Sequence, residues 1–116
     1  MHIRKIDVEA VHKLQEESGD VVLLDVREDA EFKSEAAPYA KHFPLSCLNV
    51  EEVLQNLGFE NETTTPLYFI CRSGSRSDAA AKKFYQRGYV NVYNVEGGML
   101  KWQELGLPIR KDDDGS

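Results

Sequence analysis

Leu67-Tyr68-Phe69-Ile70-Cys71-Arg72-Ser73-Gly74-Ser75-Arg76-Ser77 is the stretch of the sequence that decides the fold. Its first four residues form a continuous apolar run, as expected of a strand buried on both faces of a sheet. The following residues are small or basic, and a helix that starts near Ser77 and ends at Gly88 comes next. A strand, a short loop and a helix in this order predict one unit of an α/β protein, with Cys71 at the carboxyl end of the strand.

Strands and helices alternate on both sides of this stretch. Residues 21–24 and 90–95 are two further apolar runs with β-branched members, which predict strands. Helices are expected near residues 7–14, 50–57 and 99–105, because apolar residues lie there at helical spacing, next to capping or glycine signals. The fold class is therefore α/β, a three-layer domain with a mostly parallel central sheet flanked by helices.

Length and composition indicate one soluble domain. We assign residues 1–110 to a single domain and 111–116 to an acidic, disordered tail. Fourteen basic against twenty acidic side chains give a net charge of −6, which argues against nucleic acid as a partner. No apolar run approaches the roughly 20 residues that span a bilayer, and the start lacks the apolar core of a signal peptide. We expect a cytoplasmic protein without membrane contact.

The loop after Cys71 has the composition of an anion site around a reactive thiol. Gly74 and the serines let the chain curl so that backbone N–H groups converge on the sulfur, and the next helix adds its positive N-terminal end. Such surroundings lower a cysteine pKa from about 8.5 to ~3.5–7.5, which favours the nucleophilic thiolate. Arg72 and Arg76 add forked donors that suit an oxyanion such as sulfonate. An inert, buried cysteine is the simpler alternative.

Three segments resemble the rhodanese family. The loop Cys71-Arg72-Ser73-Gly74-Ser75-Arg76-Ser77 looks like the active-site loop of single-domain bacterial rhodaneses. Leu23-Leu24-Asp25-Val26-Arg27 with Glu31-Phe32 resembles the family's first conserved segment, and Gly97-Gly98-Met99-Leu100-Lys101-Trp102 with Gly106-Leu107-Pro108 resembles its last. One segment departs from the family pattern Gly-His-Ile-Pro-Gly-Ala and reads Glu35-Ala36-Ala37-Pro38-Tyr39-Ala40, which predicts a reshaped loop and a donor or partner preference of its own.

The resemblance implies a thiosulfate sulfurtransferase that requires no metal or organic cofactor. Cys71 is the implied catalytic nucleophile, which takes sulfur from thiosulfate or a related donor and holds it as a persulfide. A thiol, a protein acceptor or cyanide then removes that sulfur. Two arginines orient the donor and the N–H groups of the loop stabilise the negative sulfur. The implied substrate-binding residues are Arg72, Ser73, Gly74, Ser75, Arg76 and Ser77.

Two other functions stay open at this point. Cysteine phosphatases and arsenate reductases use a similar thiolate cradle, but their arginine lies six positions after the cysteine, where this chain has Ser77. Arg76 falls one position early, and the smaller loop favours a sulfur atom. The other alternative is a non-catalytic interaction module, since rhodanese-like domains also serve as binding domains. Those often lack the cysteine that is present here.

Four further residues are predicted to be structural. Arginine does not deprotonate in proteins, so Arg27 is expected to bridge Asp25 or Glu31 beneath the loop rather than act as a base. Met99 and Trp102 are expected in the core. Cys47 is expected to be a buried structural cysteine, with a resolving thiol for the persulfide as the alternative.

Overall fold

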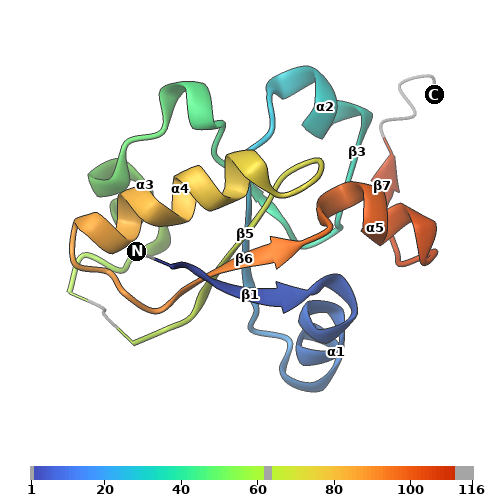
Figure 1. Cartoon of the computed structure of the whole chain (residues 1–116), viewed down its shortest axis with the longest axis horizontal. Coiled ribbons are helices and arrows are strands. Elements are labelled where there is room, and N and C mark those ends of the chain that lie inside the picture. The colour runs from blue at the N-terminus through green and yellow to red at the C-terminus, as the bar shows by residue number, and fades with distance from the viewer. Residues whose placement is uncertain (1, 62–63, 112–116) are drawn as a thin grey trace.

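The computed structural model describes residues 2–61 and 64–111, and Figure 1 shows a central sheet with helices on both faces. Within these residues the sheet has the order β1 (Arg4–Asp7), β6 (Val92–Glu96), β5 (Leu67–Ile70), β2 (Val22–Asp25) and β4 (Lys41–His42), and each neighbouring pair is parallel. The helices are α1 (Val8–Ser18), α2 (Asp29–Ser34), α3 (Val50–Leu57), α4 (Ser75–Gln86) and α5 (Gly98–Glu104). The predicted three-layer α/β fold is confirmed.

Alternate residues of the two central strands face opposite layers, as the two-residue period of a strand requires. On one face Leu24, Leu67 and Phe69 join residues of α3 and α4, namely Val53, Ala80 and Phe84. On the other face Leu23, Tyr68 and Ile70 join residues of α1 and α5, namely Val11, Met99 and Trp102. The continuous apolar runs follow from this double covering, and the core positions predicted for Met99 and Trp102 are confirmed. No helix in the described ranges is long and apolar enough to cross a membrane.

Capping residues set several boundaries where the sequence predicts them. The Asn49 side chain accepts a hydrogen bond from the N–H of Glu52 at 3.0 Å, which caps α3, and Gly58 ends that helix with φ +75°. The strand β5 has the predicted bounds. Helix α4 begins at Ser75, two residues earlier than expected, so Arg76 lies in its first turn.

Short, polar elements that the sequence does not predict complete the fold. The edge strand β1 consists mostly of exposed and charged residues and therefore lacks an apolar run. A separate antiparallel pair joins β3 (Glu35–Ala36) to β7 (Arg110–Lys111). Lys111, assigned to the tail from the sequence, pairs there with Glu35, so the folded domain includes one residue more than expected. The rest of the predicted tail lies outside the described residues.

A buried ion pair fixes the chain where it leaves β2. Asp25 is fully buried and Arg27 is 3% exposed. The Asp25 carboxylate accepts hydrogen bonds from Arg27 Nη2 at 2.8 Å, from Nε at 3.0 Å and from the backbone N–H at 3.0 Å. Arg27 Nη2 also donates to the carbonyl of Glu35 at 2.6 Å. The predicted Asp25–Arg27 bridge is confirmed, and it ties β2 to β3.

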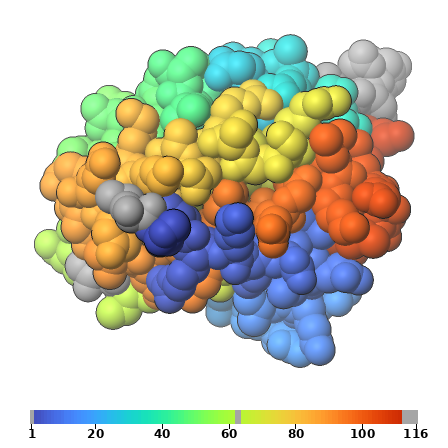
Figure 2. All heavy atoms as spheres, in the orientation of Figure 1, coloured from blue at the N-terminus to red at the C-terminus, as the bar shows by residue number. Residues whose placement is uncertain are grey.

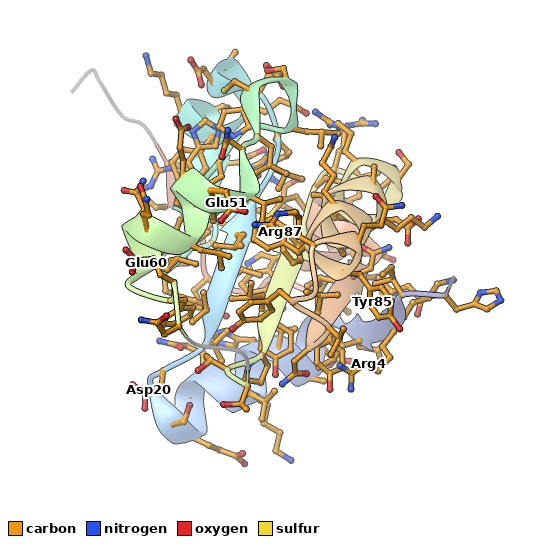
Figure 3. All side chains as sticks on the ribbon, turned by 90° about the vertical axis from the view of Figure 1, so that its left-hand side faces the viewer. Arg4, Asp20, Glu51, Glu60, Tyr85 and Arg87 are labelled. Atoms are coloured by element: carbon orange, nitrogen blue, oxygen red, sulfur yellow. The ribbon has the colours of Figure 1, made fainter. Side chains whose placement is uncertain are left out.

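A second ion pair lies at the surface and can be compared with the buried Asp25–Arg27 pair. Glu51 of α3 and Arg87 after α4 point toward one another at the surface and form an ion pair (Figure 3), with each side chain 56% exposed. Exposed pairs contribute about 0–1 kcal/mol, because water and salt screen them. This pair is therefore a matched control for the buried one.

Breaking the buried pair should destabilise the domain far more than breaking the exposed one. Asp25→Leu strands the buried Arg27 cation, and we expect a loss of about 3–5 kcal/mol in the free energy of unfolding. Glu51→Gln should change it by less than about 1 kcal/mol. The measurement is urea denaturation of both variants and of Asp25→Leu/Arg27→Met, which removes both charges and should recover much of the loss. Equal effects of Asp25→Leu and Glu51→Gln would contradict this view of the pair.

Candidate active site

Cys71 follows the last residue of β5 and is 1% exposed. In Figure 2 the surface of its loop, in yellow, lies between α2, in cyan, and α5, in orange-red. A cavity of about 330 Å³ is lined by residues of these two helices and by Arg72. This is the carboxyl end of a parallel sheet, where α/β proteins bind their ligands.

Hydrogen-bond donors surround the Cys71 sulfur. The backbone N–H of Gly74 donates to Sγ at 3.1 Å, and the Ser77 hydroxyl oxygen lies 3.3 Å from it. Burial raises the pKa of the Cys71 thiol, but hydrogen bonds from the Ser77 hydroxyl and from the N–H groups of Ser77, Gly74 and Ser73 lower it further than burial raises it. The net pKa lies below the ordinary value, which is the direction that the sequence predicts.

The two arginines of the loop have different partners. Arg76 donates to both carboxylate oxygens of Glu31 in α2, at 2.7 Å and 2.9 Å. The Arg76 hydrogen bond is the main cause that lowers the Glu31 pKa from 4.5 to about 2. Arg72 is exposed, lines the cavity and forms no ion pair within residues 2–61 and 64–111. The structure thus leaves Arg72 available to a ligand and neutralises Arg76.

Asn94 of β6 belongs to the site, although sequence reasoning missed it. The residue is 5% exposed, and its amide nitrogen donates to the Gly74 carbonyl at 3.0 Å. Its Oδ1 accepts from the Ser77 hydroxyl at 2.6 Å. The available signal was a polar amide inside an apolar strand, because a buried amide requires hydrogen-bond partners.

Helix α5 holds the loop through backbone contacts. The N–H of Met99 donates to the Cys71 carbonyl at 2.8 Å, and the N–H of Leu100 donates to the Arg72 carbonyl at 3.1 Å. Gly98 has φ +57°, and a Cβ there would lie 2.4 Å from the Cys71 oxygen and 2.5 Å from the Arg72 oxygen. Only glycine permits this approach.

The predicted burial of Cys47 is wrong. Leu45–Cys47 form a 3₁₀ turn in which Leu45, like Leu48 after it, packs against the core, which leaves Cys47 exposed. The segment that departs from the family pattern is partly buried: Ala36 and Ala37 are 0% and 1% exposed. Tyr39 in this segment lies beside His12 and Trp102.

The fold and site define a class of protein: a parallel α/β domain with a cysteine in a cradle of N–H groups. The family described as Rhodanese-like domain matches residues 7–105, so the chain belongs to the rhodanese-like family.

Individual relatives agree with this assignment. The chain is 40% identical over 91 residues to an uncharacterized protein of Synechocystis, covering 78% of this chain but 48%, about half, of that protein. It is 31% identical over 107 residues to a sulfurtransferase of Allochromatium vinosum, covering 92% of this chain and 94% of the relative. The crystal structure of a rhodanese-like domain protein from Staphylococcus aureus is 28% identical, with a TM-score of 0.70, covering 94% of this chain and 100% of that one.

Replacing Gly98 should disrupt the loop around Cys71. Gly106 also has a positive φ, +70°, but no atom lies within 4 Å of a Cβ built there, so Gly106→Ala measures the conformational cost alone, about 1–2 kcal/mol. Gly98→Ala adds a clash with two carbonyl oxygens, and we expect at least about 2 kcal/mol more destabilisation. Thermal unfolding measures both variants. Equal losses would show that the approach of α5 to the loop is not tight.

The Glu31–Arg76 pair should make stability depend on acidic pH. The folded pKa of Glu31, about 2, lies below the ordinary 4.5, so its contribution is present above pH 4.5 and is lost as the pH falls toward 2. Because the pair is partly exposed, we expect a contribution of about 1 kcal/mol. Urea unfolding between pH 6 and pH 2.5 should show a smaller decrease for Glu31→Gln than for the wild type. Parallel curves would exclude this role of the pair.

Proposed function

We propose that the chain is a thiosulfate sulfurtransferase in which Cys71 carries the sulfur as a persulfide. The observation that carries the proposal is the Cys71 sulfur itself, which has a lowered pKa and accepts a hydrogen bond from the Gly74 N–H at 3.1 Å. Membership of the rhodanese-like family and the relative named a sulfurtransferase support the transfer of sulfur. No cofactor is needed for the chemistry that follows.

In the first half of the cycle the Cys71 thiolate attacks the outer sulfur of thiosulfate. A bond forms between Sγ and that sulfur, the bond between the two thiosulfate sulfurs breaks, and sulfite leaves with its electron pair. One thiolate and one thiosulfate dianion thus become one persulfide anion and one sulfite dianion, so charge is conserved. Arg72, exposed in the cavity wall, attracts and orients the anionic donor.

In the second half an acceptor takes the outer sulfur of the persulfide. Cyanide becomes thiocyanate and the Cys71 thiolate is regenerated, while a small thiol or a protein thiolate would itself become a persulfide. Until then the outer sulfur carries the negative charge, and the backbone N–H groups of the loop stabilise it as an oxyanion hole stabilises oxygen. The same donors thus serve both the thiolate and the persulfide.

The position of Arg76 favours sulfur over phosphate as the transferred group. A cysteine phosphatase needs a free arginine to hold the oxygens of phosphate at the centre of the cradle. Arg76 instead lies in the first turn of α4 and binds Glu31 through both of its terminal nitrogens. Residue 77, where phosphatases have the arginine, provides a hydroxyl 3.3 Å from the sulfur.

Intact-mass spectrometry after incubation with thiosulfate tests the proposal. The wild type should gain the mass of one sulfur atom, and cyanide should remove it with formation of thiocyanate. Cys71→Ser should show no adduct, whereas Cys47→Ser is the matched control and should retain it, since Cys47 is exposed and lies outside the loop. The absence of an adduct on the wild type would refute the persulfide. Hydrolysis of p-nitrophenyl phosphate through Cys71, without thiocyanate formation, would favour a phosphatase.

A further inference from the structure

A chain of polar contacts runs from β6 to the active-site sulfur. Asn94 Oδ1 lies 2.6 Å from the Ser77 hydroxyl oxygen, which lies 3.3 Å from Cys71 Sγ. Ser77 is fully buried, Cys71 is 1% exposed and Asn94 is 5% exposed. Because these groups are almost completely buried, each depends largely on the others for hydrogen bonds.

The Ser77 hydroxyl has one proton and three acceptors within reach: Asn94 Oδ1 at 2.6 Å, the Gly74 carbonyl at 3.1 Å and the Cys71 sulfur at 3.3 Å. The Gly74 carbonyl already accepts from the Asn94 amide at 3.0 Å and from the N–H of Asp78 at 3.2 Å. The proton of Ser77 therefore goes either to Asn94 or to the sulfur.

The charge on the sulfur decides between these two positions. A Cys71 thiol donates to the Ser77 oxygen, and Ser77 then donates to Asn94, so that every group is satisfied. A thiolate, whose proton has left to water, only accepts. If Ser77 turns its proton to the thiolate, its lone pairs face Asn94 Oδ1 at the 2.6 Å separation. Rotation of the amide removes that repulsion but places Oδ1 against the Gly74 carbonyl.

We propose that Asn94 is a positioning residue that competes with Sγ for the proton of Ser77 and thereby stabilises the states in which Sγ is uncharged. The consequence of this inference for the reaction cycle rests on the proposed function. In the persulfide the charge lies on the outer sulfur and Sγ is a neutral, divalent atom, so Ser77 returns its proton to Asn94. Asn94 thus raises the energy of the attacking thiolate and favours formation of the persulfide over its loss.

Charged groups around the site also act on the Cys71 sulfur, and they are the same in all of the variants compared. Arg76 faces the sulfur from α4 and is paired with Glu31 of α2. A second hollow beside Gly74 and Asn94 is lined by His2, by Lys5 of β1, and by Asp78 and Lys82 of α4, which pair at 3.0 Å. None of these residues is changed in the variants below, so a difference between variants reports the polar chain itself.

The pH dependence of Cys71 alkylation by iodoacetamide tests the proposal, in a Cys47→Ser background so that only one thiol reacts. Asn94→Leu nearly preserves side-chain volume and removes the oxygen that accepts the Ser77 proton. The midpoint, which is the pH at which the alkylation rate is half of its maximum, should therefore fall. Losing the effect of one hydrogen bond changes an equilibrium constant about fivefold. At pH values below the wild-type midpoint, we therefore expect Cys71 of the Asn94→Leu variant to be alkylated about fivefold faster than Cys71 of the wild type. Asn91→Leu is the control, because Asn91 bonds Arg4 and the Thr64 carbonyl at the other end of the strand segment, and it should leave the midpoint unchanged.

The role of Ser77 is tested by a double variant. In a Ser77→Ala background, Asn94→Leu should have no effect on the midpoint, because the group that links Asn94 to the sulfur is absent. A rise or no change with Asn94→Leu, or a fall that persists in Ser77→Ala, would overturn the proposal. Should Asn94→Leu fail to fold, Asn94→Ala replaces it: alanine also removes the acceptor without adding a charge, so the midpoint must fall, and a rise or no change overturns the proposal. Alkylation needs no sulfur donor, so the result stands whether or not a persulfide forms.

Discussion

The hydrogen bond from the Leu100 N–H to the Arg72 carbonyl, 3.1 Å long, orients the peptide groups on which the site depends. A trans peptide is planar, so its N–H points away from its carbonyl. When α5 draws the Arg72 carbonyl toward itself, the N–H of Ser73 in the same peptide is turned toward the sulfur, where it lowers the pKa of Cys71. Gly98 makes this possible, because a side chain there would collide with the same carbonyl. The cradle is thus built as much by α5 as by the loop's own residues.

The distribution of charge follows from the same arrangement. Among the arginines of the loop and of the cavity wall, Arg27 is held by Asp25 and Arg76 by Glu31. The Arg76–Glu31 pair connects α4 to α2, and both pairs neutralise a cation that would otherwise attract anions. Arg72 is left without an ion pair in the described part of the chain, on a protein whose net charge is −6. An anionic ligand in this cavity would therefore meet one local positive group and not a broad positive surface.

The sequence was sufficient for the framework and for the position of Cys71 at the end of β5, because both depend on local signals. Local residues determine the strand before Cys71, and they determine the two ends of α3, where Asn49 caps the helix and Gly58 ends it. The elements it missed depend on distant partners: β1 is polar and exists by pairing with β6, and β3 exists by pairing with β7. The same holds for the site. Nothing local distinguishes Arg76 from Arg72, because Glu31, the partner that separates their roles, is 45 residues away.

Asn94 illustrates how a buried polar residue connects fold and chemistry. A buried amide is unfavourable unless all of its hydrogen bonds form, and an apolar side chain of the same volume would suit the interior of a strand better. The amide is satisfied only because β6 lies beside β5 and Gly74 turns its carbonyl back toward the sheet. Its nitrogen then fixes the loop, while its oxygen is directed at the single hydroxyl that contacts the sulfur. A residue that contributed only packing would need neither contact, so the polarity of Asn94 follows from its two hydrogen bonds, one to the loop and one to the hydroxyl beside the sulfur.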